Sequence, residues 1–392
     1  MTPASRRTEA VSAKLNDENT SYWLALGRVE GLGVRGARKL MERFSSPVAA
    51  YHASLTELES CGLPAQVAQA IFAQAGLEEA EKEIEAAAKL GCELMTAGSA
   101  DYPPLLREIP DPPLALYVRG DSKVLSRHTV AMVGTRRPTA YGLQVARRLA
   151  RDLAERQLVI ASGLARGIDS AAHHGALEGA GKTVAVLGSG IDVIYPKENK
   201  RLAEKILASG ALVSEFPLGT APTPENFPIR NRIISGLSLG VIIVEAAEYS
   251  GSLITARLAS EQNREVFGVP GNITTAQSFG PNHLIKQGAK LVDHWIDVVE
   301  EFPAEIRMQL LPPAEASERA TNRPDAPSLF DQSLTLEQKA VYEVLRPDVP
   351  LFVDSIAGSV SLSSPRVLAA LLELEMSGLI RQLPGKNFIR KL

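Results

Sequence analysis

Short apolar runs recur along the middle of the chain, and each ends in glycine or in a polar residue. Seven runs rich in Val, Ile and Leu occupy residues 129–133, 158–161, 183–187, 212–215, 241–245, 266–269 and 290–292. Segments with helical periodicity separate them, for example Tyr141–Arg156 and Lys200–Ala208. This alternation predicts βαβ units and a buried parallel sheet. Because such sheets bind ligands beyond the carboxyl ends of their strands, we look for function at those ends.

The pattern before the sheet is helical. Two pairs of helical segments extend from about Tyr22 to Leu90, and the first pair is interrupted by Gly31-Leu32-Gly33. We therefore predict a helical domain over residues 20–98 whose glycine turn resembles that of a helix-hairpin-helix module. Backbone N–H groups in such a turn can hold a phosphate. The alternative, a plain corner of a small helical bundle, is equally compatible with the pattern.

The pattern after the sheet domain, which we predict to span residues 99–301, changes twice. Residues 302–333 contain several prolines and little periodicity, so they are predicted to be a linker. Residues 334–392 contain three helical segments and a hairpin-like tail, which is typical of a winged helix. Glu373 and Glu375 in the third segment are unfavourable for a helix that enters a DNA groove. Contact with protein is therefore the favoured role of this unit.

The composition is that of a globular protein of two to four domains, with 392 residues, 45% hydrophobic and 22% charged. The net charge of −3 gives no overall attraction to nucleic acid or membranes. However, residues 127–240 contain 15 Lys and Arg against 9 Asp and Glu. Local charge decides what a surface attracts, so the sheet domain could bind an anion.

Cysteine content and apolar segments bear on location. Cys61 and Cys92 are the only cysteines, too few for a disulfide framework, and they suit a reducing compartment. The first ten residues lack the apolar core of a secretory signal. The longest apolar runs fall far short of the roughly 20 residues that span a bilayer. We therefore expect a cytoplasmic protein without a membrane span.

Motifs for cofactors, metals and catalysis are weak. Gly179–Thr183 reads GAGKT, but a predicted strand follows where a phosphate-binding loop requires a helix. Gly188–Asp192 lacks the third glycine of a dinucleotide fingerprint. His173 and His174 have no evident Cys or carboxylate partner for a metal ion. We therefore expect no cofactor, no metal ion and no catalytic activity.

Glycine and basic residues concentrate after four of the predicted strands. Gly134 follows the first strand, and the loop Ser162–Asp169 follows the second. In this loop, glycines could direct backbone N–H groups at an anion, and Asp169 would either cap the following helix or orient the loop. Basic residues beside an aromatic ring suit single-stranded nucleic acid, because phosphates bind Arg and Lys while a base stacks. The alternative is that Phe227 belongs to the core and the arginines form ion pairs. The candidate residues are Gly134, Thr135, Arg136, Ser162, Gly163, Gly167, Lys197, Asn199, Lys200, Phe227, Arg230, Asn231 and Arg232.

Several of these segments occur together in one known family. The ordered motifs VGTR, SGLARGID, SEFP, FPIRNRIISGLS, SGSLITA, FGVPGN and GPNHLIKQGA resemble those of the DNA-processing protein A (DprA/Smf) family over about Tyr102–Glu301. The resemblance implies an extended Rossmann-like, doubly wound α/β domain that binds single-stranded DNA. It also implies an N-terminal SAM-like helical domain and a C-terminal winged helix.

The resemblance further implies a role. Members protect incoming single strands during natural transformation and help to load the RecA recombinase. They are not known as enzymes, and they commonly form homodimers through a segment that corresponds to about His283–Val292. The candidate residues above are those that would line the DNA pocket. Relatives often place a basic residue shortly before the Phe-Pro pair, where this chain has Pro224-Glu225-Asn226.

Two other functions remain open from the sequence. A nucleoside-phosphate hydrolase could use the same loops, with Glu245 as acid or base, but it would need a Pro-Gly-Gly-x-Gly-Thr loop where this chain reads EYSGSLITA. A transcription regulator could use the winged unit, and the acidic Glu373 and Glu375 argue against that role.

Overall fold

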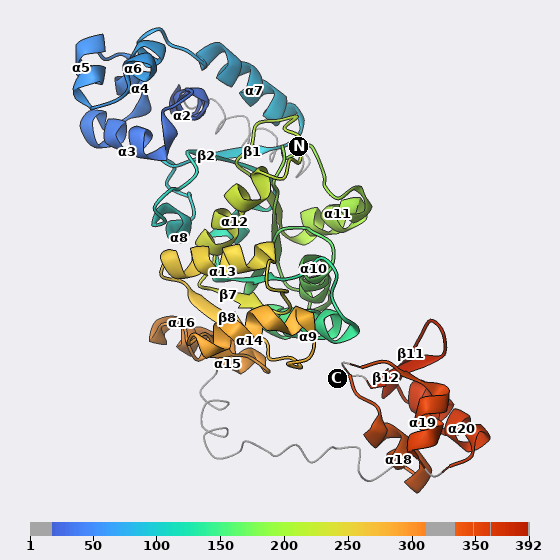
Figure 1. Cartoon of the computed structure of the whole chain (residues 1–392). Coiled ribbons are helices and arrows are strands. Elements are labelled where there is room, and N and C mark those ends of the chain that lie inside the picture. Colours follow the sequence, from blue (N-terminus) through green and yellow to red (C-terminus); the bar gives the residue numbers. More distant parts are fainter. Residues whose placement is uncertain (1–17, 311–333, 348, 361, 391–392) are drawn as a thin grey trace.

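The computed structural model describes residues 18–310, 334–347, 349–360 and 362–390 (Figure 1). The N-terminal part is helical, as the sequence predicts. It consists of α2 (Glu18–Arg28), α3 (Gly33–Phe44), α4 (Pro47–Tyr51), α5 (Leu55–Ser60), α6 (Ala65–Phe72) and α7 (Leu77–Lys89). Gly31 and Gly33 adopt φ values of 81° and 57° at the turn between α2 and α3. This left-handed backbone is the reason that glycine is required there.

A nine-stranded sheet forms the centre of the molecule. Its strands are β1 (Glu93–Thr96), β2 (Ala115–Gly120), β3 (Thr129–Val133), β4 (Val159–Ser162), β5 (Thr183–Val186), β6 (Ala211–Ser214), β7 (Gly240–Ile243), β8 (Glu265–Gly268) and β9 (Lys290–Leu291). Their spatial order is β1-β2-β6-β5-β4-β3-β7-β8-β9. Only the β1–β2 and β2–β6 pairings are antiparallel. The predicted mostly parallel, doubly wound sheet is confirmed.

The strand order fixes where the carboxyl ends meet. The chain runs outward from β3 through β4, β5 and β6, then returns to place β7 on the other side of β3. The parallel strands therefore end at one edge of the sheet, with a topological switch between β3 and β7. We refer to this edge, formed by the loops after β3, β4, β5 and β6, as the rim.

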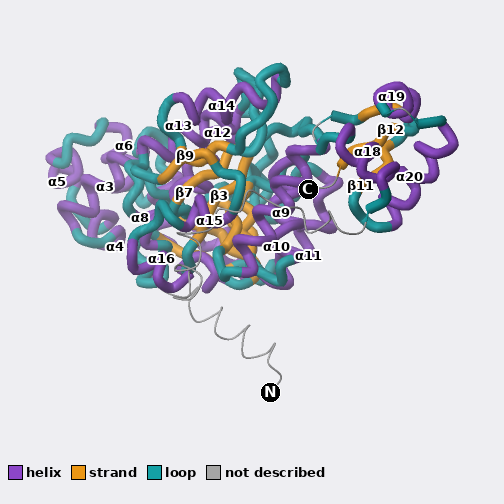
Figure 2. The backbone as a smooth tube through the Cα atoms, turned by 90° about the horizontal axis from the view of Figure 1, so that it is seen from below, coloured by secondary structure: helices purple, strands orange, loops and turns teal. Residues whose placement is uncertain are grey.

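Helices cover both faces of the sheet (Figure 2). One face packs against α12 (Asn226–Gly236) and α13 (Gly251–Glu261), with the short α8 (Pro104–Arg107) beside them. The other face packs against α9 (Ala140–Glu155), α10 (Ile168–Glu178) and α15 (Trp295–Val299). The remaining elements are α11 (Lys200–Ser209), α14 (Phe279–Lys286), α16 (Ala304–Leu310) and the 3-10 turns η1 (Ser122–Ser126), η2 (Lys197–Asn199) and η3 (Ala276–Ser278).

The N-terminal helices and the sheet share one hydrophobic core. Buried side chains of α2 and α3, such as Leu26 and Leu40, belong to the same cluster as Tyr117 on β2 and Leu202 on α11. The expected domain boundary at residue 98 therefore falls after the first strand of the sheet, because β1 already pairs with β2. The expected linker over 302–333 likewise begins with a helix, α16. Its remainder, residues 311–333, lies outside the described residues.

The C-terminal unit has a core of its own. It consists of α18 (Leu336–Val344), β10 (Leu351–Phe352), α19 (Val353–Ser359), α20 (Ser364–Met376), β11 (Ile380–Leu383) and β12 (Asn387–Arg390). The strands form an antiparallel sheet in the order β10-β12-β11. Val341, Ile356, Leu371 and Phe388 are buried together. The predicted winged helix is confirmed.

No single helix in the described ranges is long and apolar enough to cross a membrane. The bent pair formed by α19 and α20 is long and apolar enough for a membrane span by length and composition alone. Its apolar residues Ile356, Val367 and Leu371 are buried in the core of the winged unit.

Candidate nucleic-acid interface

Two loops of the rim, those after β3 and β5, meet at the ring of Phe227 in the first turn of α12. The guanidinium of Arg136, after β3, lies 5.2 Å from the ring centroid. The ring of Tyr195, in the loop after β5, has its centroid 5.8 Å away. A Cβ atom on Gly188 would lie 2.8 Å from Phe227 Cδ1, so glycine is needed beneath the ring. Phe227 is half-buried, so part of its ring remains accessible from solvent.

The loop after β4 is held in one conformation by polar side chains. Asp169 Oδ2 accepts hydrogen bonds from the backbone N–H groups of Gly163 (3.1 Å) and Ala165 (3.3 Å). Asn199 Nδ2 donates to the carbonyl of Leu164 at 2.8 Å. Burial raises the pKa of Asp169. The expected role of Asp169 as orienter of the loop is confirmed, and it uses two of the N–H groups that we expected to face an anion.

Arg230 supports this loop from inside the protein. Its side chain is buried, and Nη1 donates to the carbonyls of Gly163 (2.7 Å) and Val186. Burial lowers the pKa of Arg230 to about 10, while the Asp169 carboxylate acts in the opposite direction. The guanidinium lies 6.0 Å from the Phe227 centroid. Arg230 therefore supports the loop after β4 and lies near the Phe227 ring, and it does not extend into solvent.

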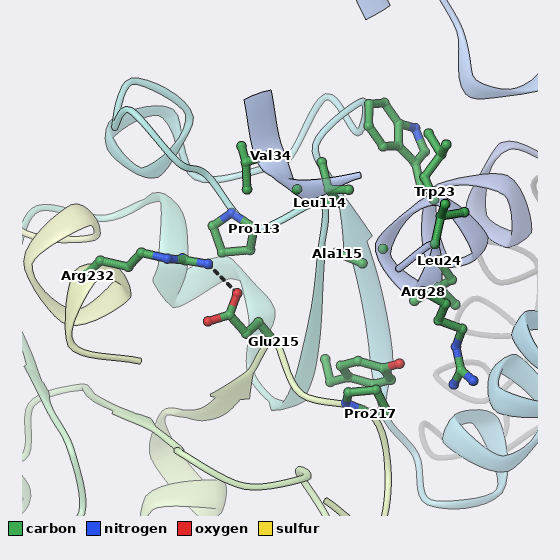
Figure 3. Close-up of a pocket in the computed structure, with 15 residues that line it drawn as sticks. Trp23, Leu24, Arg28, Val34, Pro113, Leu114, Ala115, Glu215, Pro217 and Arg232 are labelled. Carbon is green, nitrogen blue, oxygen red and sulfur yellow. Dashed lines mark hydrogen bonds and ion pairs between the residues drawn. The ribbon is translucent and has the colours of Figure 1, made fainter. Parts of the chain in front are cut away.

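Arg232 lies apart from the other candidate residues. It is buried in a cleft of about 190 Å³ between α2 and the ends of β2 and β6 (Figure 3). There it forms ion pairs with Glu215 and with Asp111 (Nε to Oδ2, 3.1 Å). Two residues along a helix correspond to a rotation of about 200°, so Arg230 and Arg232 point to opposite sides of α12. The expectation that Arg232 lines the same pocket is wrong in geometry, and the ion-pair alternative describes this residue.

The glycines of the rim loops are packed against protein. A Cβ atom on Gly134 would lie 2.6 Å from Ile168 Cγ1, and one on Gly163 would lie 2.5 Å from the Arg230 guanidinium. At Gly167, where φ is 78°, a Cβ atom would collide with the carbonyl oxygen of Thr135. These glycines allow the loops to pack on one another. Our interpretation that Gly134 leaves room for a ligand is replaced by this packing role.

The remaining candidates divide into supporting and exposed residues. Ser162 is buried and its hydroxyl donates to the carbonyl of Met132 at 2.7 Å. Thr135 Oγ1 accepts from its own loop, from Arg137 N at 3.2 Å. Asn231 Oδ1 accepts from Arg230 Nε at 3.2 Å. The exposed cations are Arg136, Lys197 and Lys200.

These three cations have no ion-pair partner within the described ranges. By contrast, Arg166 in the neighbouring loop pairs with Glu198, Nη2 to Oε2 at 2.9 Å. The rim therefore presents an aromatic ring, a cation over that ring and further cations on the following loop. This combination can stack a base and neutralise phosphates.

Tyr195 is the residue that sequence reasoning left out of the candidate list. It is 44% exposed and contacts Phe227 from the loop after β5. The sequence carries a signal, because Tyr195 stands two residues before Lys197 in a segment that follows a predicted strand, as Phe227 stands shortly before Arg230. With Phe227 it makes a two-ring surface.

Glu245 has a structural role at the start of α9. Its carboxylate is buried and accepts hydrogen bonds from the backbone N–H (2.9 Å) and the hydroxyl (2.5 Å) of Thr139, at the start of α9. Glu245 thus stabilises the beginning of α9, whereas the helix that follows it, α13, is capped by Ser250.

Of the two adjacent histidines, His173 has a structural role. His173 is buried, its Nδ1 lies 2.7 Å from Thr183 Oγ1, and that hydroxyl donates to the Ile160 carbonyl. Because the hydroxyl proton is already used, His173 donates through Nδ1. Burial lowers the pKa of His173 to about 3. No group of three or more potential metal ligands exists in the part of the chain that the structure describes.

Comparison with known proteins identifies the same regions. Residues 93–303 match the family model of DNA recombination-mediator protein A. Residues 322–386 match the DprA winged helix domain.

Individual relatives cover most of the chain. Protein Smf of Escherichia coli is 44% identical over 293 residues, covering 74% of this chain and 76% of that protein. Protein Smf of Synechocystis is 34% identical over 394 residues, covering 95% of this chain and 98% of that protein. The X-ray structure of DNA processing protein A from Streptococcus pneumoniae superposes with a TM-score of 0.61 at 35% identity. That match covers 76% of this chain and 98% of the solved one.

Proposed function

Because this chain belongs to the DNA-processing protein A (DprA/Smf) family, we propose that it binds single-stranded DNA at the rim and protects incoming strands during natural transformation. One observation carries the proposal. The exposed Arg136 guanidinium lies over the half-buried ring of Phe227, and the ring of Tyr195 is centred 5.8 Å from that ring. A stacking surface flanked by cations without carboxylate partners suits an unpaired strand.

The bound strand is then passed to the RecA recombinase, so the chain acts as a recombination mediator. Membership of the family supports the loading step, whereas the geometry of the rim supports DNA binding. Binding and loading require no covalent bond to be broken, so the proposed role is not enzymatic. It also needs no cofactor. We place the role in the cytoplasm.

We further propose a homodimer through the segment around His283–Val292. This segment includes part of α14 and all of β9, and Leu291 on β9 is 43% exposed. Phe279, at the start of α14, is also exposed and stacks on His283. Exposed apolar side chains at a sheet edge favour an interface between copies. Sedimentation equilibrium of Leu291→Lys against the unaltered chain tests the dimer.

The test of DNA binding compares two neighbouring arginines. Arg136→Ala removes the cation over Phe227, and Arg137→Ala removes an exposed cation one residue later. We expect Arg136→Ala to raise the Kd for oligo-dT at least tenfold, and Arg137→Ala to raise it less than threefold. Fluorescence anisotropy with single- and double-stranded oligonucleotides at two salt concentrations measures both. Equal affinity for both kinds of DNA, or no loss in Arg136→Ala, contradicts the proposal.

The loading step has a separate test. Wild-type chain is expected to speed RecA filament formation on single-stranded DNA coated with single-strand-binding protein, and Arg136→Ala is expected to lose this effect. Normal DNA binding by the wild type without any acceleration would reject loading while leaving DNA binding intact.

A further inference from the structure

A row of basic side chains continues away from the rim along α11. Lys197 in η2 is followed by Lys200, Arg201 and Lys205 in α11, and all four side chains are exposed. Within α11, Arg201 and Lys205 are four residues apart, so their side chains lie one turn apart on the same side, and Lys197 precedes them in the 3-10 turn η2. We call these four residues the α11 ridge. Leu202, Ala203 and Ile206 face the core, which leaves the ridge on the solvent side.

The cations of the ridge are not neutralised by the protein. None of the four has an ion-pair partner within the described residues. Glu204 is the one exposed acid on α11, and Glu198 in η2 is already paired with Arg166. The ridge therefore holds an excess of positive charge.

Helix α9, on the same face, shows the opposite arrangement. Arg148 lies 3.8 Å from Asp152, and Arg151 lies 3.1 Å from the same carboxylate. Arg147 pairs with Glu178 of α10. The arginines of α9 thus have carboxylates of this chain as partners, as is common on a solvated surface. The contrast indicates that the ridge is not an ordinary charged helix face.

The positive charge of the ridge extends to the neighbouring helix. His174 of α10 is exposed, and partial burial together with Arg147 and Lys205 lowers its pKa. Lys205 is therefore close enough to α10 for its charge to act there. Figure 1 shows α11 and α10 side by side at the same flank of the sheet. Like charges gathered without counter-charges favour an external polyanion.

We propose that the α11 ridge is a second contact surface for single-stranded DNA, along which the sugar-phosphate chain continues after leaving the rim. The proposal rests on the DNA binding proposed above and adds a path and a length to it. From Lys200 to Lys205 the helix rises by roughly 8 Å, enough for about two stacked nucleotides. The contacts are to phosphates, so the ridge adds affinity without sequence preference.

The experiment separates the ridge from the rim by oligonucleotide length. The double variant R201A/K205A removes two cations remote from Phe227. The matched control R148A/R151A removes the same charge from α9. Labelled dT6, which we expect to occupy the rim, and dT20, which is long enough to reach the ridge as well, are titrated by anisotropy between 50 and 300 mM salt.

For the ridge variant we expect a Kd for dT20 about tenfold higher at 0.1 M salt, and a Kd for dT6 within twofold of wild type. The slope of log K against log salt for dT20 should fall by about 1.4, since each phosphate contact on a single strand contributes roughly 0.7. The control should leave both values within twofold. The charge reversal R201E/K205E should weaken dT20 further, and circular dichroism checks that the exposed substitutions leave the fold intact.

Three results would each overturn the proposed role of the ridge. R201A/K205A could lose equal affinity for dT6 and dT20, R148A/R151A could lose as much affinity as R201A/K205A, or the affinity of R201A/K205A for dT20 could be unchanged. Failure of the wild-type chain to bind either oligonucleotide would instead reject the proposed DNA-binding function, so the two failures are distinguishable.

Discussion

The rim and the winged unit are two regions from which DNA recognition could be expected, and they differ in how their charges are used. At the rim, Arg136 lies exposed over an aromatic ring. On α20, the helix that would enter a groove, Leu368 and Leu372 are 49% and 59% exposed, and Arg366 pairs with Glu337 at 2.9 Å. A helix with exposed leucines and a neutralised arginine is suited to another protein. Under the proposed function, exposed cations without an ion-pair partner among the described residues mark the nucleic-acid site, whereas the winged-helix fold by itself does not.

The largest effect is expected from the buried support of the rim. Arg230→Met should lower the free energy of unfolding of the sheet domain by about 3 kcal/mol, because the carbonyls of Gly163 and Val186 lose their donor and Asp169 loses a nearby cation. Urea denaturation measures the change. Exposed Arg366→Met in the winged unit is the control and should change stability by less than about 0.5 kcal/mol. Equal stability of the two variants would contradict the supporting role.

The next-largest difference between the sheet domain and the winged unit is expected in how their stability depends on pH. His173 has a pKa of about 3 in the folded chain against 6.5 when unfolded. Below pH 6.5 the unfolded chain therefore binds a proton that the folded chain does not, and stability falls by up to about 1.4 kcal/mol per pH unit down to about pH 3. His173→Gln should remove this part of the pH dependence, as measured by unfolding at pH 7 and pH 5. The winged unit contains no histidine, and its unfolding should be unchanged by the substitution.

Stacking at the rim is expected to contribute less than the buried support does. Phe227→Ala should raise the Kd for oligo-dT by about 30-fold, which corresponds to roughly 2 kcal/mol for one stacked base. Phe72→Ala, at a ring that is 54% exposed in the N-terminal helices, is the control. Anisotropy titration measures both, and a Phe227 variant that binds like the Phe72 variant would remove stacking from the explanation.

The smallest effect is expected in the winged unit. Leu372→Gln should change the Kd for single-stranded DNA by less than twofold and stability by less than about 0.5 kcal/mol, because this side chain is mostly solvated. A fivefold loss of DNA affinity would place the winged unit in the DNA site and remove the difference between the two regions.

The sequence predicted the elements of the fold well, because their signals are local. The predicted strand Thr129–Val133 has the observed bounds, and the remaining predicted strands of the parallel sheet differ by one or two residues. β-branched runs between glycines specify buried strands regardless of what packs on them. The winged unit was likewise recognisable from its three helical segments and its hairpin-like tail.

The roles of individual site residues were less predictable. Arg136, Arg230 and Arg232 look alike in a sequence, yet the first is exposed, the second supports a loop and the third forms ion pairs in a separate cleft. Their roles depend on helix phase and on carbonyls and carboxylates contributed by distant segments. Asn199 is similar, since its amide binds the Leu164 carbonyl 35 positions earlier. Such long-range pairings have no local signature.

The core shared by the N-terminal helices and the sheet has a consequence for how the protein melts. Leu26, Leu40, Tyr117 and Leu202 lose their environment together, so residues 18–310 should denature in one cooperative step, and a chain lacking its first 90 residues should aggregate on expression. The winged unit, with its independent set of buried residues, should contribute a separate heat-absorption peak in scanning calorimetry.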